Sequence, residues 1–185
     1  GEGGVITTNS KKNYSYCKSY HDHGHSFINK NRGKDTAKFP GFNYRITELQ
    51  GAIGLAQIKK VHFILNENKK RYMCLKKIEK FTDVRKINNF TTPNYDTFIF
   101  FTQKNSTKNK VLKYLNRTIG TKNLPDALNW HDASNWKHIL GKKKTSELKK
   151  YTEVLNRSIA VPILIEKKVN FYKEITQDLI KILND

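Results

Sequence analysis

Three short segments of the chain carry side chains whose types and spacing could do chemistry. In the first, His21, Asp22, His23 and His25 place three imidazoles and a carboxylate within five residues. Zinc accepts such a set of donors. However, alternating neighbours form only a local cluster, and no distant cysteine or histidine has a convincing metal-ligand spacing. We therefore predict no metal site from these residues.

The other two segments have less specific spacing when taken alone. Asn43 stands just before a helix signal, where asparagine is also a common turn residue. Further along, Trp130, His131, Trp136 and His138 bring two indoles and two imidazoles together within nine residues. A hydrophobic satellite cluster, in which each ring N–H donates to a carbonyl, would use the same residues. Both segments keep a structural and a functional interpretation at this point.

A long helix after Asn43 is the strongest signal among the elements that would position these side chains. Thr47 and Gln50 fit a capping box, in which each side chain bonds the other residue's backbone N–H. Together with the apolar spacing, this predicts one helix from about 47 to 78. Gly51 and Gly54 inside it each cost about 1 kcal/mol relative to alanine, which close packing of another backbone would justify. The apolar residues at helical spacing are Leu49, Ile53, Ala56, Val61, Ile64 and Leu65.

The rest of the chain alternates between strand and helix signals, which predicts an α/β or α+β domain. Residues 9–42 have no clear periodicity and indicate a long loop, and residues 120–140 are aromatic and irregular. The expected strands are 5–8, 97–101 and 158–161, the last ended by Pro162, and the expected helices are 109–115, 146–156 and 171–183. The expected inward residues of the first two helices are Val111, Leu112, Leu115, Leu148, Tyr151 and Leu155.

The net charge of +19 raises nucleic acid as a partner. Lysine outnumbers arginine 29 to 6, however, whereas surfaces that bind phosphates and bases usually favour the arginine fork. Asparagine and isoleucine are abundant at 19 and 17 residues, while alanine occurs 6 times. AT-rich codons encode this combination, so base-composition drift also explains the charge, and we expect no nucleic-acid partner.

The length of 185 residues suggests about one domain. No apolar run approaches the roughly 18 residues that a membrane span needs, so we expect no membrane role. Cys17 and Cys74 are far apart and lack a redox-motif spacing. A reducing cytoplasm is therefore the expected compartment.

Several blocks, taken together, resemble one known family. They are GEGG at residues 1–4, VITT at 5–8 and GFNYR-x-TELQ-x-AIG-x-AQ at 41–57. In this order they are similar to the DegT/DnrJ/EryC1/StrS family of sugar aminotransferases, which use pyridoxal phosphate (PLP). The match is dense over 1–8 and 41–60 and looser beyond. The DHGH segment, followed by Arg32-Gly33-x-Asp35, looks closest to a branch acting on octulosonate sugars of the Kdo type.

The resemblance implies an α/β fold that is the C-terminal part of a fold-type I PLP-dependent aminotransferase. Residues 1–40 would be the tail of the large PLP-binding domain, 41–80 the long connecting helix, and 81–185 the small C-terminal domain. In the family, GEGG lies just after the lysine that forms the Schiff base with PLP. We therefore expect that lysine to lie before Gly1, so that residues 1–185 hold no catalytic residue and are inactive alone. They should also expose apolar surface where the rest of the large domain would pack.

The resemblance also implies roles for four residues. Asn43 matches the asparagine that donates to the PLP phosphate in the neighbouring subunit's active site, and a neutral amide suits a dianion. Arg45 is similar to an arginine that contacts the phosphate or acidic group of a nucleotide-sugar. Tyr44, between them, joins the substrate-binding set, although packing is its more direct interpretation. In the small domain His131 is the better match to a sugar-facing histidine, with His138 second.

The implied reaction moves an amino group from glutamate to a keto-sugar in surface polysaccharide biosynthesis. The implied cofactor is pyridoxal 5'-phosphate, and the implied assembly is a homodimer whose active site is shared between subunits. Two alternatives stay open at this point. The chain could be a small basic nucleic-acid-binding module, or a non-catalytic paralogue that keeps the fold as an interaction domain.

Overall fold

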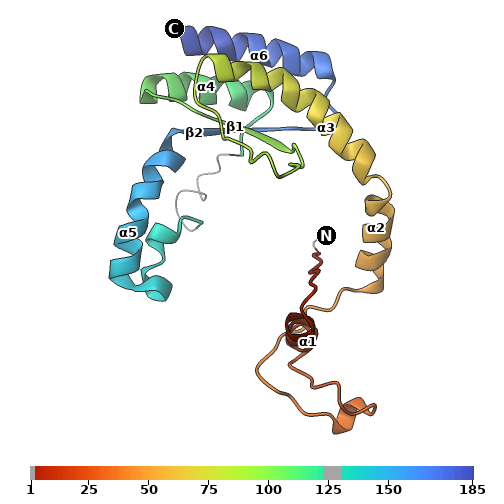
Figure 1. The fold of residues 1–185 in the computed structure, drawn as a ribbon. Coiled ribbons are helices and arrows are strands. Elements are labelled where there is room, and N and C mark those ends of the chain that lie inside the picture. The colour runs from red at the N-terminus through yellow and green to blue at the C-terminus, as the bar shows by residue number, and fades with distance from the viewer. Residues whose placement is uncertain (1–2, 123–130) are drawn as a thin grey trace. The chain divides into compact units, whose positions relative to one another are not determined.

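The computed structural model describes residues 3–122 and 131–185. Residue contacts divide the chain into two compact units, Gly1–Val61 and His62–Asp185. In chain order the helices and strands are α1 (Lys11–Tyr20), α2 (Glu48–Ile58), α3 (Val61–Leu75), β1 (Thr97–Phe101), α4 (Asn105–Thr118), α5 (Lys137–Arg157), β2 (Ser158–Pro162) and α6 (Val169–Asn184) (Figure 1). Short 3-10 turns occur at Arg32–Lys34, Lys76–Lys80 and Ala133–Asn135.

The first unit contains a helix, α1, in the segment where a long loop was predicted. The hydroxyl of Ser10 caps it by accepting from the Asn13 N–H at 3.3 Å. The Tyr16 ring stacks on Tyr20 and on Phe39, with centroid distances of 5.9 and 4.7 Å. Because α1 packs through aromatic rings rather than a repeating aliphatic face, its periodicity gave no helix signal. Residues 3–8 form no strand, so the strand expected at 5–8 is wrong.

The predicted helix over 47–78 is present as two helices, α2 and α3. The predicted capping box is confirmed: Gln50 N–H donates to the Thr47 hydroxyl at 3.2 Å, and Thr47 N–H donates to the Gln50 side chain at 2.9 Å. After Ile58 the chain tightens into a turn in which Lys60 N–H donates to the Gln57 carbonyl at 2.9 Å. This turn ends α2, and α3 begins at Val61.

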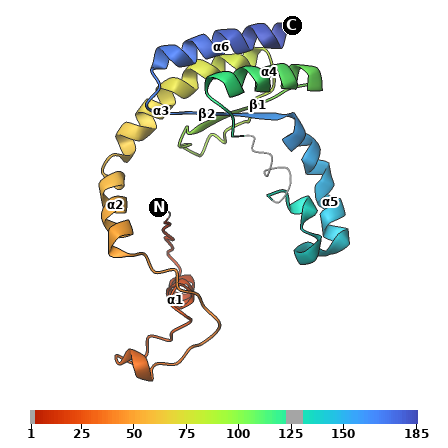
Figure 2. The ribbon, with the colours of Figure 1, turned by 180° about the vertical axis from the view of Figure 1, so that it is seen from behind.

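The second unit is built on a two-stranded antiparallel sheet. Strand β1 pairs with β2 in a register that sets Thr97 opposite Pro162 and Phe101 opposite Ser158. Both views place α3, α4 and α6 on the same side of this sheet (Figures 1 and 2). Strand side chains alternate between the two faces, so every second residue meets the helices. The strands predicted at 97–101 and 158–161 are confirmed.

The core of the second unit lies between the sheet and these helices. Its fully buried members on the sheet are Phe98, Phe100, Ile159 and Val161. The helices α3, α4 and α6 and the 3-10 turn after α3 contribute Leu75, Ile78, Val111, Leu115, Tyr172, Ile175 and Leu179. The inward face predicted for the helix at 109–115 and the helix predicted at 171–183 are therefore confirmed, although both helices extend beyond those limits.

Helix α5 differs from its prediction in both extent and orientation. It begins at Lys137, with a kink at Gly141, where φ is 75°. Tyr151 and Leu155, which were expected to point inward, are 56% and 40% exposed. The buried residue is Thr145, whose hydroxyl donates to the Gly141 carbonyl at 3.0 Å. Packing through hydroxyl groups leaves no apolar periodicity to detect, so the inward face was assigned wrongly.

Helix α2 leaves its apolar side chains open to solvent. It has no buried residue, and its four large apolar side chains are between 53% and 72% exposed. A Cβ added to Gly51 or Gly54 would meet nothing within 4 Å. The described residues therefore supply no neighbouring backbone that would explain these two glycines. The exposed side chains are Leu49, Ile53, Leu55 and Ile58.

Among residues 3–122 and 131–185, no helix combines the length and apolar character needed to cross a membrane. Both cysteines in the described chain, Cys17 and Cys74, are free thiols.

We expect the Phe98→Ala variant to lower the free energy of unfolding by about 3–5 kcal/mol. The Phe98 ring is fully buried and packs against Tyr72 and Phe100, at centroid distances of 5.1 and 6.2 Å. The matched control is Phe90→Ala, because Phe90 is 95% exposed. This control should change the free energy by less than about 0.5 kcal/mol. Urea unfolding followed by tryptophan fluorescence measures both, and equal losses would contradict this core.

Candidate functional site

The candidate site in the first unit depends on a close crossing of two backbone segments at Gly24 and Gly41. A Cβ added to Gly41 would lie 2.3 Å from the Gly24 nitrogen and 2.8 Å from the Tyr20 carbonyl oxygen. A Cβ added to Gly24 would lie 1.9 Å from the Phe39 carbonyl oxygen, and its φ of +77° also favours glycine. Any side chain at either position would push the segments apart. The two glycines therefore let the DHGH segment lie directly against the GFNYR segment.

Asp22 and Asn43 face each other across this crossing. They form an isolated antiparallel bridge, with a backbone hydrogen bond on either side of the pair. In this kind of pair the two side chains stand on the same face at their closest approach. The histidine-rich segment thus sets a carboxylate beside the asparagine. The two flanking bonds run from His23 N–H to the Phe42 carbonyl (3.1 Å) and from Tyr44 N–H to the His21 carbonyl (2.8 Å).

A tight turn begins at Asp22 and reverses the chain next to this pair. His25 N–H donates to the Asp22 carbonyl at 3.1 Å. The two central residues, His23 and Gly24, have φ values of 55° and 77°. Positive φ at both positions is the pattern of a type I′ turn. His23 therefore serves a backbone role, for which histidine is one of the more tolerant side chains.

Alternate residues after Gly41 separate into a polar face and an aromatic face. On the polar side, Arg45 Nε donates to the Asn43 side-chain oxygen at 3.0 Å. On the other side, the rings of Phe42 and Tyr44 lie 5.5 Å apart and both contact Tyr20. This separation follows from the two-residue repeat of extended backbone. Tyr44 thus lies in an aromatic cluster, although 64% of it is exposed.

Asp22 is the buried charge of the polar face. The residue is 4% exposed, and its carboxylate accepts from a terminal nitrogen of Arg32. The Arg45 Nε lies 3.5 Å from the same oxygen. A buried carboxylate is costly unless it is paired, and two guanidinium groups supply that pairing here. Asp22, Arg32 and Arg45 together carry one net positive charge.

On the polar face, the groups that can still form hydrogen bonds to a ligand are N–H donors. The Asn43 side-chain oxygen is engaged by Arg45 through both Nε and the backbone N–H, at 3.0 and 3.4 Å. In the part of the chain that the structure describes, the Asn43 amino group and the terminal nitrogens of Arg45 have no recorded partner. An exposed amide donor beside a guanidinium suits an anionic oxygen ligand such as a phosphate. PLP carries such a phosphate, so this donor set fits the cofactor that the sequence analysis implied.

A hairpin over residues 25–37 holds Arg32 near Asp22. Its ends pair at His25 and Ala37. Inside it, the carboxylate of Asp35 accepts from the Ser26 hydroxyl and, at 2.8 Å, from the Phe27 N–H. These hydrogen bonds, that of Ser26 first, hold the pKa of Asp35 well below its ordinary value. The pKa of Asp35 is thus lower in the folded state than in the unfolded state. Its hydrogen bonds therefore stabilise the fold at pH values above the unfolded-state pKa, and this stabilisation is lost as pH falls through the folded-state pKa.

His25 faces this carboxylate. Its Nδ1 lies 3.6 Å from an Asp35 oxygen and is buried without a hydrogen-bond partner among the described residues. His21 is engaged differently, since its Nδ1 lies 2.7 Å from the Lys18 carbonyl. Asp22 is paired with arginines. Within residues 3–122 and 131–185, no group of three or more histidine, cysteine or acidic side chains could hold a metal ion.

The predicted residues of the small domain belong to the second unit. His131 directly precedes Asp132, whose carboxylate accepts from the Ser134 N–H at 2.9 Å and from the Thr152 hydroxyl at 3.0 Å. His138 lies in the first turn of α5. Residues 123–130 of the same block, with Trp130, lie outside the described residues. The roles of His131 and His138 stay predictions.

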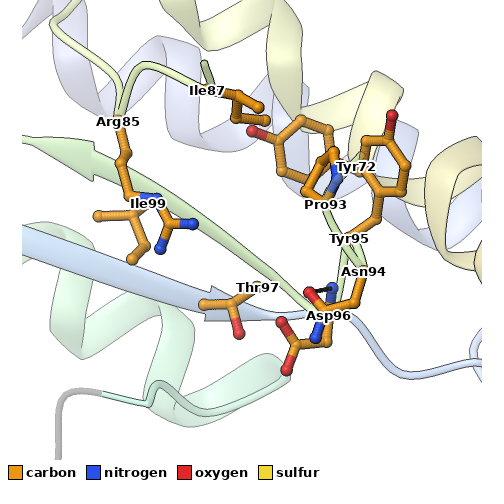
Figure 3. Close-up of a pocket in the computed structure, with 9 residues that line it drawn as sticks. All are labelled: Tyr72, Arg85, Ile87, Pro93, Asn94, Tyr95, Asp96, Thr97 and Ile99. Atoms are coloured by element: carbon orange, nitrogen blue, oxygen red, sulfur yellow. Dashed lines mark hydrogen bonds between the residues drawn. The ribbon is translucent and has the colours of Figure 1, made fainter. Parts of the chain in front are cut away.

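A cavity in the second unit is too small for a sugar or a cofactor. Its volume is about 30 Å³, and Tyr72, Arg85 and Tyr95 are among the residues that line it (Figure 3). Such a space holds a water molecule, whereas small-molecule sites need roughly 300–1,000 Å³. Tyr95 has a φ of 56°, and the Asn68 amide donates to the neighbouring Asn94 carbonyl at 3.2 Å. This cavity is therefore part of the packing around β1.

Sequence reasoning missed the contribution of Asp22 and Arg32 to the polar face. Asp22 was considered only as a metal ligand, and Arg32 only as a family feature. The available signal was the pair Gly24 and Gly41, one in each segment, because glycines at a crossing indicate close backbone approach. The sequence does not show which glycine lies against which, so this signal alone does not identify the two segments that meet.

The known proteins to which the chain is similar are aminotransferases. The family model described as "DegT/DnrJ/EryC1/StrS aminotransferase family" matches residues 1–175. The UDP-4-amino-4,6-dideoxy-N-acetyl-beta-L-altrosamine transaminase of Helicobacter pylori is 30% identical over 79 residues, which are 43% of this chain and 20% of that protein. The structure of Helicobacter pylori PseC, an aminotransferase involved in the biosynthesis of pseudoaminic acid, matches with a TM-score of 0.60 and 18% identity.

The structural match covers 96% of this chain and 47% of PseC. The chain therefore spans less than half the length of the solved structure that it matches, and a fifth of the curated relative. The predicted α/β fold of a fold-type I aminotransferase is confirmed by this likeness. The Kdo-type branch is not tested by these relatives and stays a prediction.

We expect Gly41→Ala to open the crossing and to lower the free energy of unfolding of the first unit by about 1–3 kcal/mol. The new Cβ would overlap backbone atoms, which cannot move aside as a flexible side chain can. The matched control is Gly33→Ala in the same segment, where an added Cβ would lie 3.5 Å from the nearest atom, on Asn31. Hydrogen exchange of residues 19–45 measures both variants. Equal protection in the two variants would be inconsistent with the crossing.

Proposed function

The chain belongs to the DegT/DnrJ/EryC1/StrS aminotransferase family, and on that premise we propose that it forms part of a PLP-dependent sugar aminotransferase. The proposed reaction moves an amino group from glutamate to the keto group of a nucleotide-linked sugar, for surface polysaccharide biosynthesis. The observation that carries this proposal is the polar face, where Asn43 and Arg45 present N–H donors beside a buried carboxylate. No specific observation favours a nucleic-acid-binding module or a non-catalytic paralogue.

In this proposal Asn43 binds the phosphate of pyridoxal 5'-phosphate. Its side-chain oxygen is held by Arg45, so its amino group is the end available to a ligand. A neutral donor suits a dianion because its own desolvation costs less than that of a charged group. When bound, the cofactor supplies an electron sink for the carbon that carries the amino group. The chain's part is to orient the cofactor and to fix its position.

Arg45 is the proposed contact for the phosphate or acidic group of the sugar substrate. Its side chain is 44% exposed, and its Nε edge is occupied by Asn43 and Asp22. The edge with the two terminal nitrogens is therefore the one available for bidentate binding of an anion. Tyr44 would border the substrate from the aromatic face, and His131 would face the sugar from the small domain.

The proposed assembly is a homodimer in which Asn43 serves the cofactor of the neighbouring subunit. The exposed apolar side chains of α2 agree with a further protein contact, with the neighbouring subunit or with the rest of the large domain, since exposed apolar surface marks interaction sites. We place the protein in the cytoplasm, and its free thiols, Cys17 and Cys74, agree with a reducing compartment.

Replacing Asn43 by alanine in the complete protein should weaken PLP binding by about 10- to 100-fold, since a hydrogen bond to a charged group contributes about 1.5–3 kcal/mol. Asn43→Asp should weaken it more, because a carboxylate repels the phosphate. PLP absorbance during equilibrium dialysis gives the dissociation constants. Asn109→Ala, at an exposed residue of α4, is the control and should match the wild type. Unchanged affinity in both Asn43 variants would refute the cofactor role.

Residues 1–185 expressed alone should show no multiple turnovers with glutamate, a UDP-linked keto-sugar and PLP. The reason is that the family's catalytic lysine is expected to lie before the GEGG block. The complete protein, expressed from its whole coding sequence, should turn over under the same conditions. Circular dichroism of the 185-residue chain checks that the lack of activity does not come from unfolding. Sustained product formation by residues 1–185 would contradict the proposal.

A further inference from the structure

Asp22 is a buried charge to which the proposed function assigns no role. Its carboxylate is paired with Arg32 and lies 3.5 Å from Arg45, while the residue is only 4% exposed. A carboxylate in such a place requires a compensating partner, and Arg32 alone could supply it. The charge of Arg45 is therefore not required to neutralise Asp22, although Arg45 lies near the same oxygen. Arg45 connects the buried charge to the face that carries the free donors.

The Nε–H of Arg45 is donated to the Asn43 oxygen, and the charge of Asp22 beside it favours this orientation of the guanidinium. The Nε edge points inward, toward Asp22 and the Asn43 oxygen at 3.5 and 3.0 Å. A guanidinium on a flexible stem has many rotamers, and fixing it costs roughly 0.5–1.5 kcal/mol when a ligand must do so. Where a buried carboxylate has already oriented the group, the ligand no longer bears that cost.

The orientation of Arg45 in turn determines the orientation of Asn43. The Asn43 oxygen accepts from Nε and from the backbone N–H of Arg45. If Arg45 turned away, one of these two bonds would be lost, and the amide would be freer to present its oxygen to the ligand. An amide oxygen repels a phosphate, whereas the amino group donates to it. The buried carboxylate thus acts on both donors through one guanidinium.

We propose that Asp22 is a positioning residue for the anion site, holding Arg45 and, through it, Asn43 with their donors outward. This inference rests on the proposed function, which assigns the PLP phosphate to Asn43 and the phosphate or acidic group of the sugar to Arg45. Electrostatics alone predicts the opposite effect of Asp22. Removing its charge would raise the local net charge from one positive charge to two and strengthen anion binding. The sign of the change in affinity therefore distinguishes positioning from simple charge.

The test measures the PLP dissociation constant of the complete protein by equilibrium dialysis, with wild type and Asp22→Asn side by side. We expect Asp22→Asn to weaken PLP binding by about 3- to 10-fold, the cost of immobilising the Asn43 amide once Arg45 no longer holds it. In an Arg45→Ala background the same change should no longer weaken PLP binding, because Asp22 acts through Arg45 and only its electrostatic effect, which favours the anion, would remain. If Asp22 had only a structural role, its replacement would weaken PLP binding in that background as well.

Asp132→Asn is the matched control, because Asp132 is also a buried carboxylate, at 7% exposure, and its contacts are with Ser134 and Thr152. It should lower stability without changing the PLP dissociation constant. If Asp22→Asn does not fold, Asp22→Glu replaces it, since that variant keeps the charge but displaces it by one methylene. The same 3- to 10-fold loss, roughly, is expected there.

Three outcomes would overturn the inference. Equal or tighter PLP binding by Asp22→Asn, with wild type binding PLP normally, would overturn this proposal alone. An undiminished effect in the Arg45→Ala background would reduce Asp22 to a structural role. Wild-type protein that binds no PLP would overturn the proposed function and this inference with it.

Discussion

The close approach of two backbone segments at Gly24 and Gly41 is the constraint on which the candidate site depends. The polar contacts of the site join these two segments to each other or to Arg32 of the hairpin over residues 25–37. The flanking hydrogen bonds set Asp22 beside Asn43, and the two-residue repeat of extended backbone then sets Arg45 on the same face. None of this needs a side chain at the crossing itself. The site therefore depends first on the lack of a side chain at Gly24 and Gly41, and then on the residues around them.

The same geometry separates a polar face from an aromatic face within five consecutive residues. Phe42 and Tyr44 lie with Tyr20 in an aromatic cluster, while Asn43 and Arg45 form the polar face. An extended segment of this kind can attach itself to the protein with one face and present ligands with the other. A helix could not do so with neighbouring residues, because its faces repeat every three or four positions. Extended backbone just before the cap of α2 is thus suited to its proposed role.

The sequence predicted best those parts of the molecule whose signals are local. The capping box of Thr47 and Gln50, the strand at 97–101 and the apolar face of the final helix depend on near neighbours, and each is present. The failures involve partners distant in the sequence or packing without aliphatic periodicity. Helix α1 packs through stacked rings, and α5 buries Thr145 rather than Tyr151. Asn43 and Arg45 were identified by resemblance, but their connection to Asp22 required knowing which segments cross.

The distribution of cationic residues supports drift as the origin of the large positive charge. No lysine in the described residues is buried, so the charge of the lysines lies at the surface. Arg71, by contrast, is 6% exposed and donates to Glu67 and to the carbonyls of Ile165 and Lys167. Only the planar fork of arginine meets three such acceptors at once. Arginine also occupies both positions that pair with Asp22. Three of the arginines, Arg32, Arg45 and Arg71, thus make contacts that use the planar guanidinium, whereas the lysines lie at the surface, as expected when base composition sets much of the surface charge.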